Sequence, residues 1–235
     1  MTHDTERNNS KYDQDQIEMM KERCILVDEN DNCIGSADKW DCHRITEQSE
    51  GKLHRAFSVF LFDEQGRLLL QQRSAEKITF PNHYTNTCCS HPLNFKEELE
   101  TKDQLGVRNA AKRKLNHELG IPLDQINIDQ FKYLTRIHYK SASDDKWVEH
   151  EIDYILFLKA KVDLNINPNE VRSYKYVSEN DLKQLFKDSE TASLSEPILI
   201  TPWFKIIYNN FLSSWWSNLD KIESLKADDK IHKMI

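Results

Sequence analysis

The chain has 235 residues, of which 38% are hydrophobic and 30% are charged, and its formal net charge is −7. This length is enough for one domain with a substantial core, and the composition lies outside the disordered class. The negative charge argues against a general nucleic-acid binder, which normally carries a basic surface. No apolar run approaches the roughly 20 residues that span a bilayer, so no membrane span is expected.

The cysteines and the chain ends indicate a reducing compartment. The 5 cysteines form an odd set whose density is too low for a disulfide scaffold. The N-terminus lacks an apolar signal core and carries acids that transit peptides usually avoid. We therefore expect a cytoplasmic protein, and we expect it to be a monomer. The last three residues, Lys-Met-Ile, do not match the Ser-Lys-Leu peroxisomal address, but a peroxisomal location stays open.

In chain order, residues 1–17 are polar and without periodicity, which predicts a disordered tail before a single domain over residues 18–235. Strands are expected at 24–28, 33–35, 54–62 and 67–73, in two pairs that are each joined by a polar turn. A helix is expected over 103–119, with Gly120 and Pro122 supplying its stop.

The second half of the chain continues the alternation. Residues 131–139 and 147–161 predict another strand pair, and a short helix with a capping signal starts at Asn180. Pro202 is expected to open a last helix with one aromatic stripe, formed by Phe204, Tyr208, Phe211 and Trp215. Strands and helices alternate irregularly, so the predicted fold class is α/β, a mixed sandwich in a single domain.

Two short segments carry the clearest chemistry. In an extended chain, residues i and i+2 point to the same side, so Cys89 aligns with His91 and Glu149 aligns with Glu151. The two glutamates lie in a strand that is otherwise typical of a core. Burying carboxylates there is costly unless a cation or a proton neutralises them. The pattern suggests a metal site with an acid/base pair beside it.

His43 and His54 flank a polar loop and are further candidate ligands. Imidazoles and carboxylates together suit a borderline divalent cation such as zinc or manganese. A single histidine is more often an ordinary hydrogen-bonded residue, and these residues have no ligand spacing like Cys-x-x-Cys. The residue pattern alone therefore leaves the metal site open.

Other candidate side chains also have an ordinary structural interpretation. Cys88 is expected to be a small buried hydrophobe, because adjacent residues of an extended chain face opposite ways. Glu118 follows three cations in its helix, which favours a salt-bridged surface carboxylate. Arg73 and Lys77 are by default solvated charges. However, they stand where a strand enters a loop, and a fork donor with a point charge suits diphosphate oxygens.

Four segments together resemble the type I isopentenyl-diphosphate Δ-isomerases, a branch of the Nudix fold: residues 53–58, 85–92, 118–120 and 147–151. The resemblance runs from roughly residue 20 to 216, and within the family the chain is similar to the animal-type enzymes. Segments 85–92 and 147–151, in this order, are highly specific together, whereas either alone would be weak. The resemblance implies a Nudix-type α/β/α sandwich with a mixed sheet.

The resemblance also implies a role for particular residues. One divalent metal (Zn²⁺, Mn²⁺ or Mg²⁺) would be held by His43, His54, His91, Glu149 and Glu151. Cys89 and Glu151 would be the acid/base pair on opposite faces of the substrate. Glu118 would hold a second ion, Mg²⁺, that bridges to the diphosphate. The diphosphate-contacting positions are Lys39, Arg73, Lys77 and Ser90. Tyr139 falls at the family's active-site tyrosine, and Trp203 at the tryptophan that faces the reacting carbons.

The implied reaction converts isopentenyl to dimethylallyl diphosphate by protonation and deprotonation, in isoprenoid precursor synthesis and hence sterol synthesis. The intermediate resembles a tertiary carbocation, which an aromatic face stabilises by about 2 kcal/mol when desolvated. Water would capture that cation, so a closed apolar pocket is expected. The aromatic C-terminal helix could form its lid or wall, although a plain core helix is the simpler description.

A Nudix diphosphate hydrolase is the alternative. The helix of such hydrolases normally reads Arg-Glu-apolar-x-Glu-Glu-x-Gly, but residues 113–120 place Lys114 and His117 where two of the glutamates belong. Hydrolases need those carboxylates to gather magnesium and activate water, so a single Glu118 counts against hydrolysis. The role of Lys114 stays open. A third hypothesis, a catalytically inactive binding module, is disfavoured by the retained Cys89 and the paired glutamates.

Overall fold

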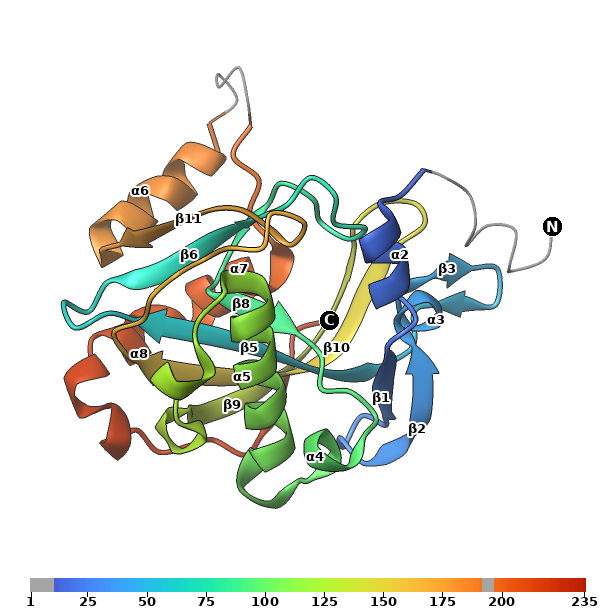
Figure 1. The fold of residues 1–235 in the computed structure, drawn as a ribbon, viewed down its shortest axis with the longest axis horizontal. Coiled ribbons are helices and arrows are strands. Elements are labelled where there is room, and N and C mark those ends of the chain that lie inside the picture. Colours follow the sequence, from blue (N-terminus) through green and yellow to red (C-terminus); the bar gives the residue numbers. More distant parts are fainter. Residues whose placement is uncertain (1–10, 192–196) are drawn as a thin grey trace.

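The computed structural model of the chain describes residues 11–191 and 197–235. Its centre is one mixed β-sheet (Figure 1). The main path of this sheet has the spatial order β11 (Val171–Val177), β6 (Leu68–Arg73), β5 (His54–Phe62), β10 (Val148–Lys159), β9 (Lys132–Ala142) and β12 (Ile231–Lys233). The pairs β5–β10 and β9–β12 are parallel, and the remaining neighbours on this path are antiparallel.

Short strands extend the sheet beside β5 and β6. They are β1 (Arg23–Val27) with its hairpin partner β2 (Cys33–Asp38), β7 (Tyr84–Thr85) on β6, and β8 (Cys88–Ser90) on β5. Two further strands, β3 (Ile45–Thr46) and β4 (Ser49–Glu50), form a separate small sheet. The predicted strands are thus present, with ends that differ by a few residues.

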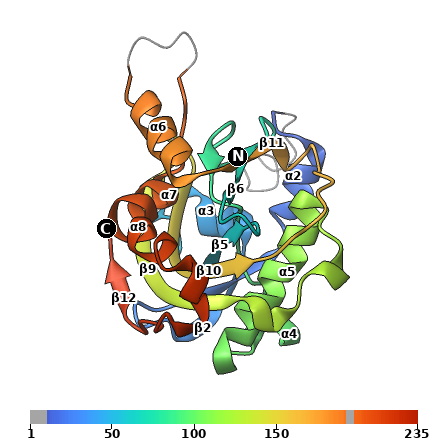
Figure 2. The same ribbon diagram turned by 90° about the vertical axis from the view of Figure 1, so that its left-hand side faces the viewer.

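Helices cover both faces of the sheet. In Figure 2, α5 (Leu105–Leu119) lies on one side, and α7 (Pro202–Ile207) and α8 (Ser213–Trp216) lie on the other. Residues of β5 alternate between these sides, so that Val59 packs into the core next to α5 and Phe60 into the core next to α7. All of β5 is buried, as expected for a strand covered on both faces. The predicted α/β/α sandwich is confirmed.

The remaining helices are shorter. They are α2 (Gln14–Met19), α3 (Lys39–His43), α4 (Lys96–Leu99) and α6 (Glu179–Ser189), the 3₁₀ turns η1 (Lys102–Gln104), η2 (Leu123–Gln125), η3 (Ile128–Gln130) and η5 (Leu219–Ser224), and the π-helical turn η4 (Tyr208–Leu212). The predicted helix at Asn180 is α6, which has a capping box at Ser178. The aromatic helix expected from Pro202 consists of α7, η4 and α8 in succession. Its aromatic stripe packs into the hydrophobic core on this side of the sheet.

The C-terminal end of α5 is fixed by Gly120, as predicted. Gly120 has a left-handed φ of 64°, and its N–H bonds to the Asn116 carbonyl oxygen at 2.9 Å. A Cβ atom at this position would lie 2.0 Å from the Asn165 carbonyl oxygen. Only glycine therefore lets the loop that contains Asn165 approach the end of the helix. The helix begins at Leu105 rather than at 103, because Asp103 has a φ of 52° that interrupts it.

The predicted disordered tail was wrong in part. Residues 1–10 lie outside the described residues, but α2 forms within residues 14–19. Asp13 caps this helix, since its Oδ1 accepts from the N–H groups of Asp15 at 2.9 Å and Gln16 at 3.2 Å. Gln16 and Ile17 are buried. The helix is short and mostly polar, so its packing, not its periodicity, holds it in place. Across residues 11–191 and 197–235, no helix is long and apolar enough to cross a membrane.

Candidate active site and metal centre

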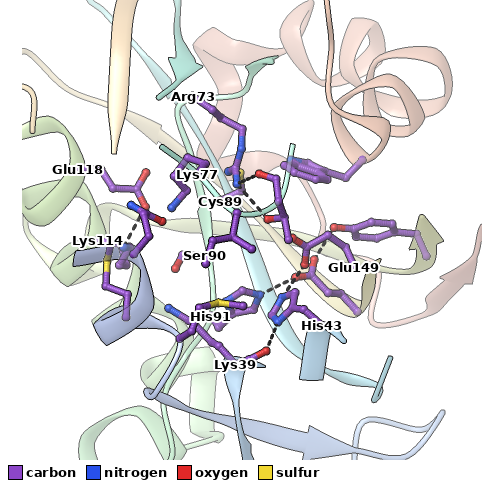
Figure 3. A pocket seen from close by; sticks show the side chains of 18 residues that line it. Lys39, His43, Arg73, Lys77, Cys89, Ser90, His91, Lys114, Glu118 and Glu149 are labelled. Atoms are coloured by element: carbon purple, nitrogen blue, oxygen red, sulfur yellow. Dashed lines mark hydrogen bonds and ion pairs between the residues drawn. The ribbon is translucent and has the colours of Figure 1, made fainter. Parts of the chain in front are cut away.

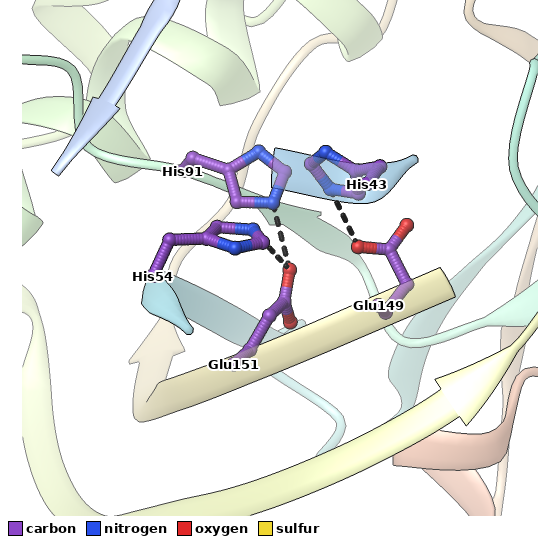
Figure 4. A group of neighbouring side chains, drawn as sticks. All are labelled: His43, His54, His91, Glu149 and Glu151. Atoms are coloured by element: carbon purple, nitrogen blue, oxygen red, sulfur yellow. Dashed lines mark hydrogen bonds and ion pairs between the residues drawn. The ribbon is translucent and has the colours of Figure 1, made fainter. Parts of the chain in front are cut away.

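Residues from distant parts of the chain meet in one buried cluster (Figure 4). His43 ends α3, His54 begins β5, and His91 directly follows β8, while the two glutamates lie on β10. The register of β5 against β10 places His54 opposite Glu151. One nitrogen or oxygen from each residue of the set lies within 4.8 Å of the others: His43, His54, His91, Glu149 and Glu151. All of them are buried.

The imidazoles of this cluster are oriented by backbone carbonyl groups. Nδ1 of His43 donates to the Lys39 carbonyl oxygen at 2.7 Å, and Nδ1 of His54 donates to the Lys52 carbonyl oxygen at 2.7 Å. Since a carbonyl oxygen can only accept, Nδ1 carries the proton in both neutral rings. When Nε2 carries no proton, its lone pair points toward the carboxylates, and this is the tautomer that binds a metal.

The carboxylates lie close to those nitrogen atoms. His43 Nε2 lies 2.7 Å from Glu149 Oε2, and His91 Nε2 lies 2.7 Å from Glu151 Oε1. His54 Nε2 is 3.5 Å from the same Glu151 oxygen. Within the described part of the chain, His54 Nε2 and Glu149 Oε2 are buried without a hydrogen-bond partner of good geometry. Unpartnered buried polar atoms of this kind fit a bound cation.

The close contacts in the cluster also shift the pKa values of its members. Burial lowers the pKa of His54, but the nearby Glu151 carboxylate outweighs it and raises that pKa to about 9. Burial, with the neighbouring His54 and His43, lowers the pKa of His91 well below its usual value. Burial raises the pKa of Glu149, but His43 outweighs it and lowers the net value. Imidazole nitrogens and carboxylate oxygens in this number suit a divalent cation, so the cluster could hold a metal ion.

A pocket adjoins this cluster (Figure 3) and brings together the residues singled out in the sequence. Its lining includes Lys39, His43, Arg73, Lys77, Cys89, Ser90, His91, Lys114, Glu118, Tyr139, Glu149, Glu151 and Trp203. Of the candidate site residues, only His54 does not line it, because His54 is fully buried. In Figure 3, Lys77, Lys114 and Glu118 lie at one end of the pocket, and His43 and Glu149 lie at the other.

The two adjacent thiols face opposite ways, as predicted. Cys88 is fully buried in the core next to α5, and Cys89 faces the pocket. Burial raises the pKa of Cys89 to about 12, although the Arg73 guanidinium, 3.9 Å from Cys89 Sγ, opposes this. Cys89 therefore carries its proton at neutral pH.

Tyr139 connects the histidine–glutamate cluster to the pocket. It lies opposite Glu151 in the pairing of β9 with β10, and its hydroxyl donates to Glu151 Oε2 at 2.5 Å. Burial, and then the charge of Glu151, raise the pKa of Tyr139 well above its usual value, so the hydroxyl stays a donor. Burial raises the pKa of Glu151, but the nearby His54 imidazole and then the Tyr139 hydroxyl outweigh this and lower the pKa, so Glu151 is ionised.

Trp203, at the start of α7, forms an aromatic wall of the pocket. Its ring centroid lies 6.1 Å from that of Tyr139 and 5.3 Å from that of Phe80. Its indole N–H donates to Asn86 Oδ1 at 3.2 Å, which fixes the ring orientation. The Arg73 guanidinium carbon lies 5.7 Å from the Trp203 ring centroid.

The candidate phosphate-binding cations are anchored by protein groups, contrary to the default expectation of solvated charges. Arg73 donates through Nε to the Phe80 carbonyl oxygen at 3.0 Å and through Nη2 to the Thr79 carbonyl oxygen at 2.7 Å. Lys77 Nζ lies 3.1 Å from both carboxylate oxygens of Glu170. The Lys39 ammonium pairs with Glu22. Ser90, the last residue of β8, is buried at the pocket wall.

The expectation of a surface position for Glu118 was wrong. Glu118 is 4% exposed, because α5 turns it inward against β6. Its Oε2 accepts from Gln71 Nε2 at 3.1 Å, and its Oε1 lies 3.2 Å from Lys114 Nζ. Glu118 is separate from the histidine–glutamate cluster. Lys114, whose role the sequence leaves open, lies between Glu118 and Glu170. No sequence pattern pointed to Glu170, which lies in a polar segment.

Comparison with known proteins identifies the class. The NUDIX domain model matches residues 52–196. A crystal structure of a Deinococcus radiodurans protein covers 81% of this chain and 100% of its own, at 16% identity and a TM-score of 0.52. A NUDIX hydrolase from Alicyclobacillus acidocaldarius covers 74% of this chain and 97% of its own, at 7% identity and a TM-score of 0.52. These structures are similar in fold, and the chain belongs to the Nudix superfamily.

Curated relatives narrow the family. An isopentenyl-diphosphate Delta-isomerase 1 from Mesocricetus auratus is 52% identical over 97% of this chain and 99% of its own length. An isopentenyl-diphosphate Delta-isomerase from Dictyostelium discoideum is 52% identical over 93% of this chain and 92% of its own. An isopentenyl-diphosphate delta-isomerase from Schizosaccharomyces pombe is 51% identical over 94% of this chain and 95% of its own length. The chain belongs to the isopentenyl-diphosphate Delta-isomerase family, which confirms the resemblance drawn from its motifs.

Proposed function

We propose that this protein isomerises isopentenyl diphosphate to dimethylallyl diphosphate by metal-dependent protonation and deprotonation. The observation that carries the proposal is one pocket that is lined by both the Cys89 thiol and the Glu151 carboxylate. The raised pKa of Cys89 and the lowered pKa of Glu151 leave the thiol protonated and the carboxylate ionised. Family membership supplies the substrate: the relatives are named for isopentenyl diphosphate.

Cys89 and Glu151 form the acid/base pair of the proposed reaction. One group gives a proton to the terminal alkene carbon, and the other takes a proton from the methylene carbon, so the double bond moves and no atoms are lost. Cys89 carries a proton that it can give, and Glu151 is ionised and can take one. Tyr139 holds the Glu151 carboxylate in place through its hydrogen bond. The substrate would lie between the two groups.

Trp203 stabilises the cation that forms between those two proton transfers. The face of an indole ring attracts a desolvated cation by about 2 kcal/mol. The hydrogen bond from Trp203 to Asn86 keeps the ring in place, and Tyr139 and Phe80 pack beside it. Because these residues are buried, the pocket limits access of water that would capture the cation.

Two divalent cations complete the proposed site. The histidine–glutamate cluster would hold Zn²⁺, Mn²⁺ or Mg²⁺, and Glu118 would hold a Mg²⁺ ion beside the diphosphate. The first ion, when bound, would neutralise the buried carboxylates, and the second would neutralise charge on the diphosphate. Lys39, Arg73, Lys77 and Ser90 would contact the diphosphate oxygens.

The setting is part of the same proposal. Isoprenoid precursor supply, including that for sterols, would be the metabolic role, carried out by a cytoplasmic monomer. Hydrolysis is the weaker candidate, because Lys114 stands at one of the missing glutamate positions and lies 3.2 Å from Glu118 Oε1. A single carboxylate paired with an ammonium group is a poor site for several magnesium ions.

The proposal is tested with purified, metal-loaded protein, isopentenyl diphosphate and magnesium. Proton NMR should show the two dimethylallyl methyl signals growing as the vinyl signals disappear, and a phosphate assay should stay at background. Phosphate release without new methyl signals would favour the hydrolase. No turnover by folded, metal-loaded protein would favour the binding module.

A further inference from the structure

Glu170 lies outside the predicted site, where α2, α5 and the loop after β6 meet. It directly precedes β11, and its side chain is fully buried. Its backbone is held on both sides, since its N–H donates to the Asn167 carbonyl oxygen at 3.0 Å and its carbonyl oxygen accepts from the Ser74 N–H at 3.0 Å. The Asn167 N–H in turn bonds to the Glu118 carbonyl oxygen at 2.9 Å, which ties this loop to the end of α5.

The Glu170 carboxylate contacts all three of these elements. From the loop after β6, Lys77 Nζ lies 3.1 Å from both carboxylate oxygens. From α5, Lys114 Nζ lies 3.2 Å from Oε2, and from α2, Gln16 Nε2 donates to Oε1 at 2.7 Å. The carboxylate is therefore fixed by the helices on two sides and presents both oxygens to Lys77.

Lys77 needs such a partner, because it lines a pocket that is crowded with cations. Arg73 and Lys114 line the same pocket, and Figure 3 shows Lys77 between them. Burial lowers the pKa of Lys77, Arg73 and Lys114 lower it further, and Glu170 opposes all three. A lysine has a flexible four-carbon stem, so without a fixed partner its ammonium group would be both disordered and repelled.

The geometry points to Glu170 as a positioning residue that holds the Lys77 ammonium ready for the substrate diphosphate, and this inference rests on the proposed function. An ammonium group has three donors, and Glu170 occupies at most two of those on Lys77. At least one donor is left for a phosphate oxygen. Because Lys77 is already ordered, its side chain loses less conformational entropy when the substrate binds. Glu170 therefore affects substrate binding and not the proton transfers.

The test compares wild type with Glu170→Gln, which removes the charge and keeps the shape. KM for isopentenyl diphosphate and Kd for inorganic diphosphate, the latter by calorimetry on metal-loaded protein, should each rise about tenfold. The value of kcat should change by less than about threefold, because the proton-transfer groups are untouched. Unchanged or lower KM and Kd would overturn the inference, since Glu170 would then only compete with the diphosphate for Lys77.

A double-mutant cycle makes the test specific for Lys77. In a Lys77→Met background, Glu170→Gln should raise Kd no further, because the group that it positions is gone. A full tenfold increase in that background would contradict the inference. If Glu170→Gln does not fold, Glu170→Asp keeps the charge on a shorter stem and should raise Kd by a smaller factor. An unchanged Kd for that variant would count against the inference in the same way.

Asp31→Asn is the matched control. Asp31 is also a buried carboxylate with two cationic partners, Arg55 Nε at 2.8 Å and Arg136 Nη1 at 3.0 Å, and it does not line the pocket. Its KM and Kd should equal those of wild type. If wild type binds inorganic diphosphate but does not convert isopentenyl diphosphate, the proposed function fails, whereas the diphosphate affinities still decide the role of Glu170.

Discussion

Tyr139 and Glu151 face each other across β9 and β10, and the Tyr139 hydroxyl donates a 2.5 Å hydrogen bond to Glu151 Oε2. The other oxygen of Glu151 faces His91 at 2.7 Å and His54 at 3.5 Å. One carboxylate is therefore shared between the histidine–glutamate cluster and the pocket. Together with the contact of Glu149 to His43, this sharing accounts for the partners of both glutamates in a strand that is otherwise typical of a core.

Replacing Tyr139 by Phe removes the hydroxyl and little else. A hydrogen bond to a charged group contributes about 1.5–3 kcal/mol, so kcat should fall roughly 10- to 100-fold. KM and metal content should stay near those of wild type, because Tyr139 belongs neither to the histidine–glutamate cluster nor to the residues proposed to contact the diphosphate. Steady-state kinetics with metal analysis check this, and a wild-type kcat would remove Tyr139 from the mechanism.

The adjacent thiols provide a matched pair. Cys89→Ala should abolish turnover while the fold and the bound metal survive, because the proton-carrying group is lost. Cys88→Ala should keep turnover and lower the free energy of unfolding by on the order of 1–2 kcal/mol, since it removes a buried sulfur from the core. Activity assays and chemical denaturation measure both. An active Cys89→Ala variant would remove Cys89 from the mechanism, and an inactive but folded Cys88→Ala variant would mean that Cys88 is the reactive thiol.

Metal affinity should depend on pH through His54. Its pKa is raised to about 9 in the metal-free protein, so a cation that binds Nε2 at neutral pH must displace a proton. Affinity for Mn²⁺ should therefore strengthen as pH rises from 7 toward 9 and level off above the pKa. Calorimetry of chelator-treated protein at several pH values tests this. A pH-independent affinity over that range would exclude His54 as the group that releases the proton.

In the metal-free protein, the sign for folding stability is the opposite. A raised pKa of His54 contributes stability that is fully present below the unfolded value of about 6.5. That contribution should be lost as pH rises through about 9. Urea unfolding of metal-free protein between pH 6 and 10 measures it, and a contribution that increases with pH would contradict the shift.

Trp203→Leu tests the role of the aromatic wall. Loss of about 2 kcal/mol of cation stabilisation should lower kcat about 30-fold, and Trp203→Phe should lower it less. Trp216→Phe is the control, because Trp216 packs on Phe62 and donates to the Gly66 carbonyl oxygen at 2.9 Å, away from the pocket. Equal kcat values for Trp203→Leu and wild type would rule out the ring as a stabiliser of the cation.

The sequence predicted those parts of the molecule that local patterns determine. The strand at residues 54–62 and the stop at Gly120 were identifiable because a buried strand and a left-handed glycine have direct sequence signals. The alternation of side chains along a strand also predicted that Cys88 and Cys89 face opposite ways. The ligand set came from a family resemblance, since its members lie too far apart in the chain to share a spacing pattern.

The remaining features depend on tertiary packing. Strand β12, near the end of the chain, pairs in parallel with β9. Its short polar sequence does not predict this long-range pairing. Glu118 looks like a surface residue until α5 is placed against β6. Glu170 and Gln16 become meaningful only when three separate elements meet around one carboxylate. Such junctions leave no periodic signal in a single sequence.

The most direct measurement of the central claim follows isopentenyl diphosphate and the metal-loaded protein by NMR in deuterated water. If Cys89 and Glu151 exchange protons with opposite faces of the substrate, solvent deuterium should enter the new methyl group, and reversal should carry it into the methylene position. Dimethylallyl diphosphate that forms without deuterium would mean that hydrogen moves within the substrate, which would contradict a mechanism built on two protein groups.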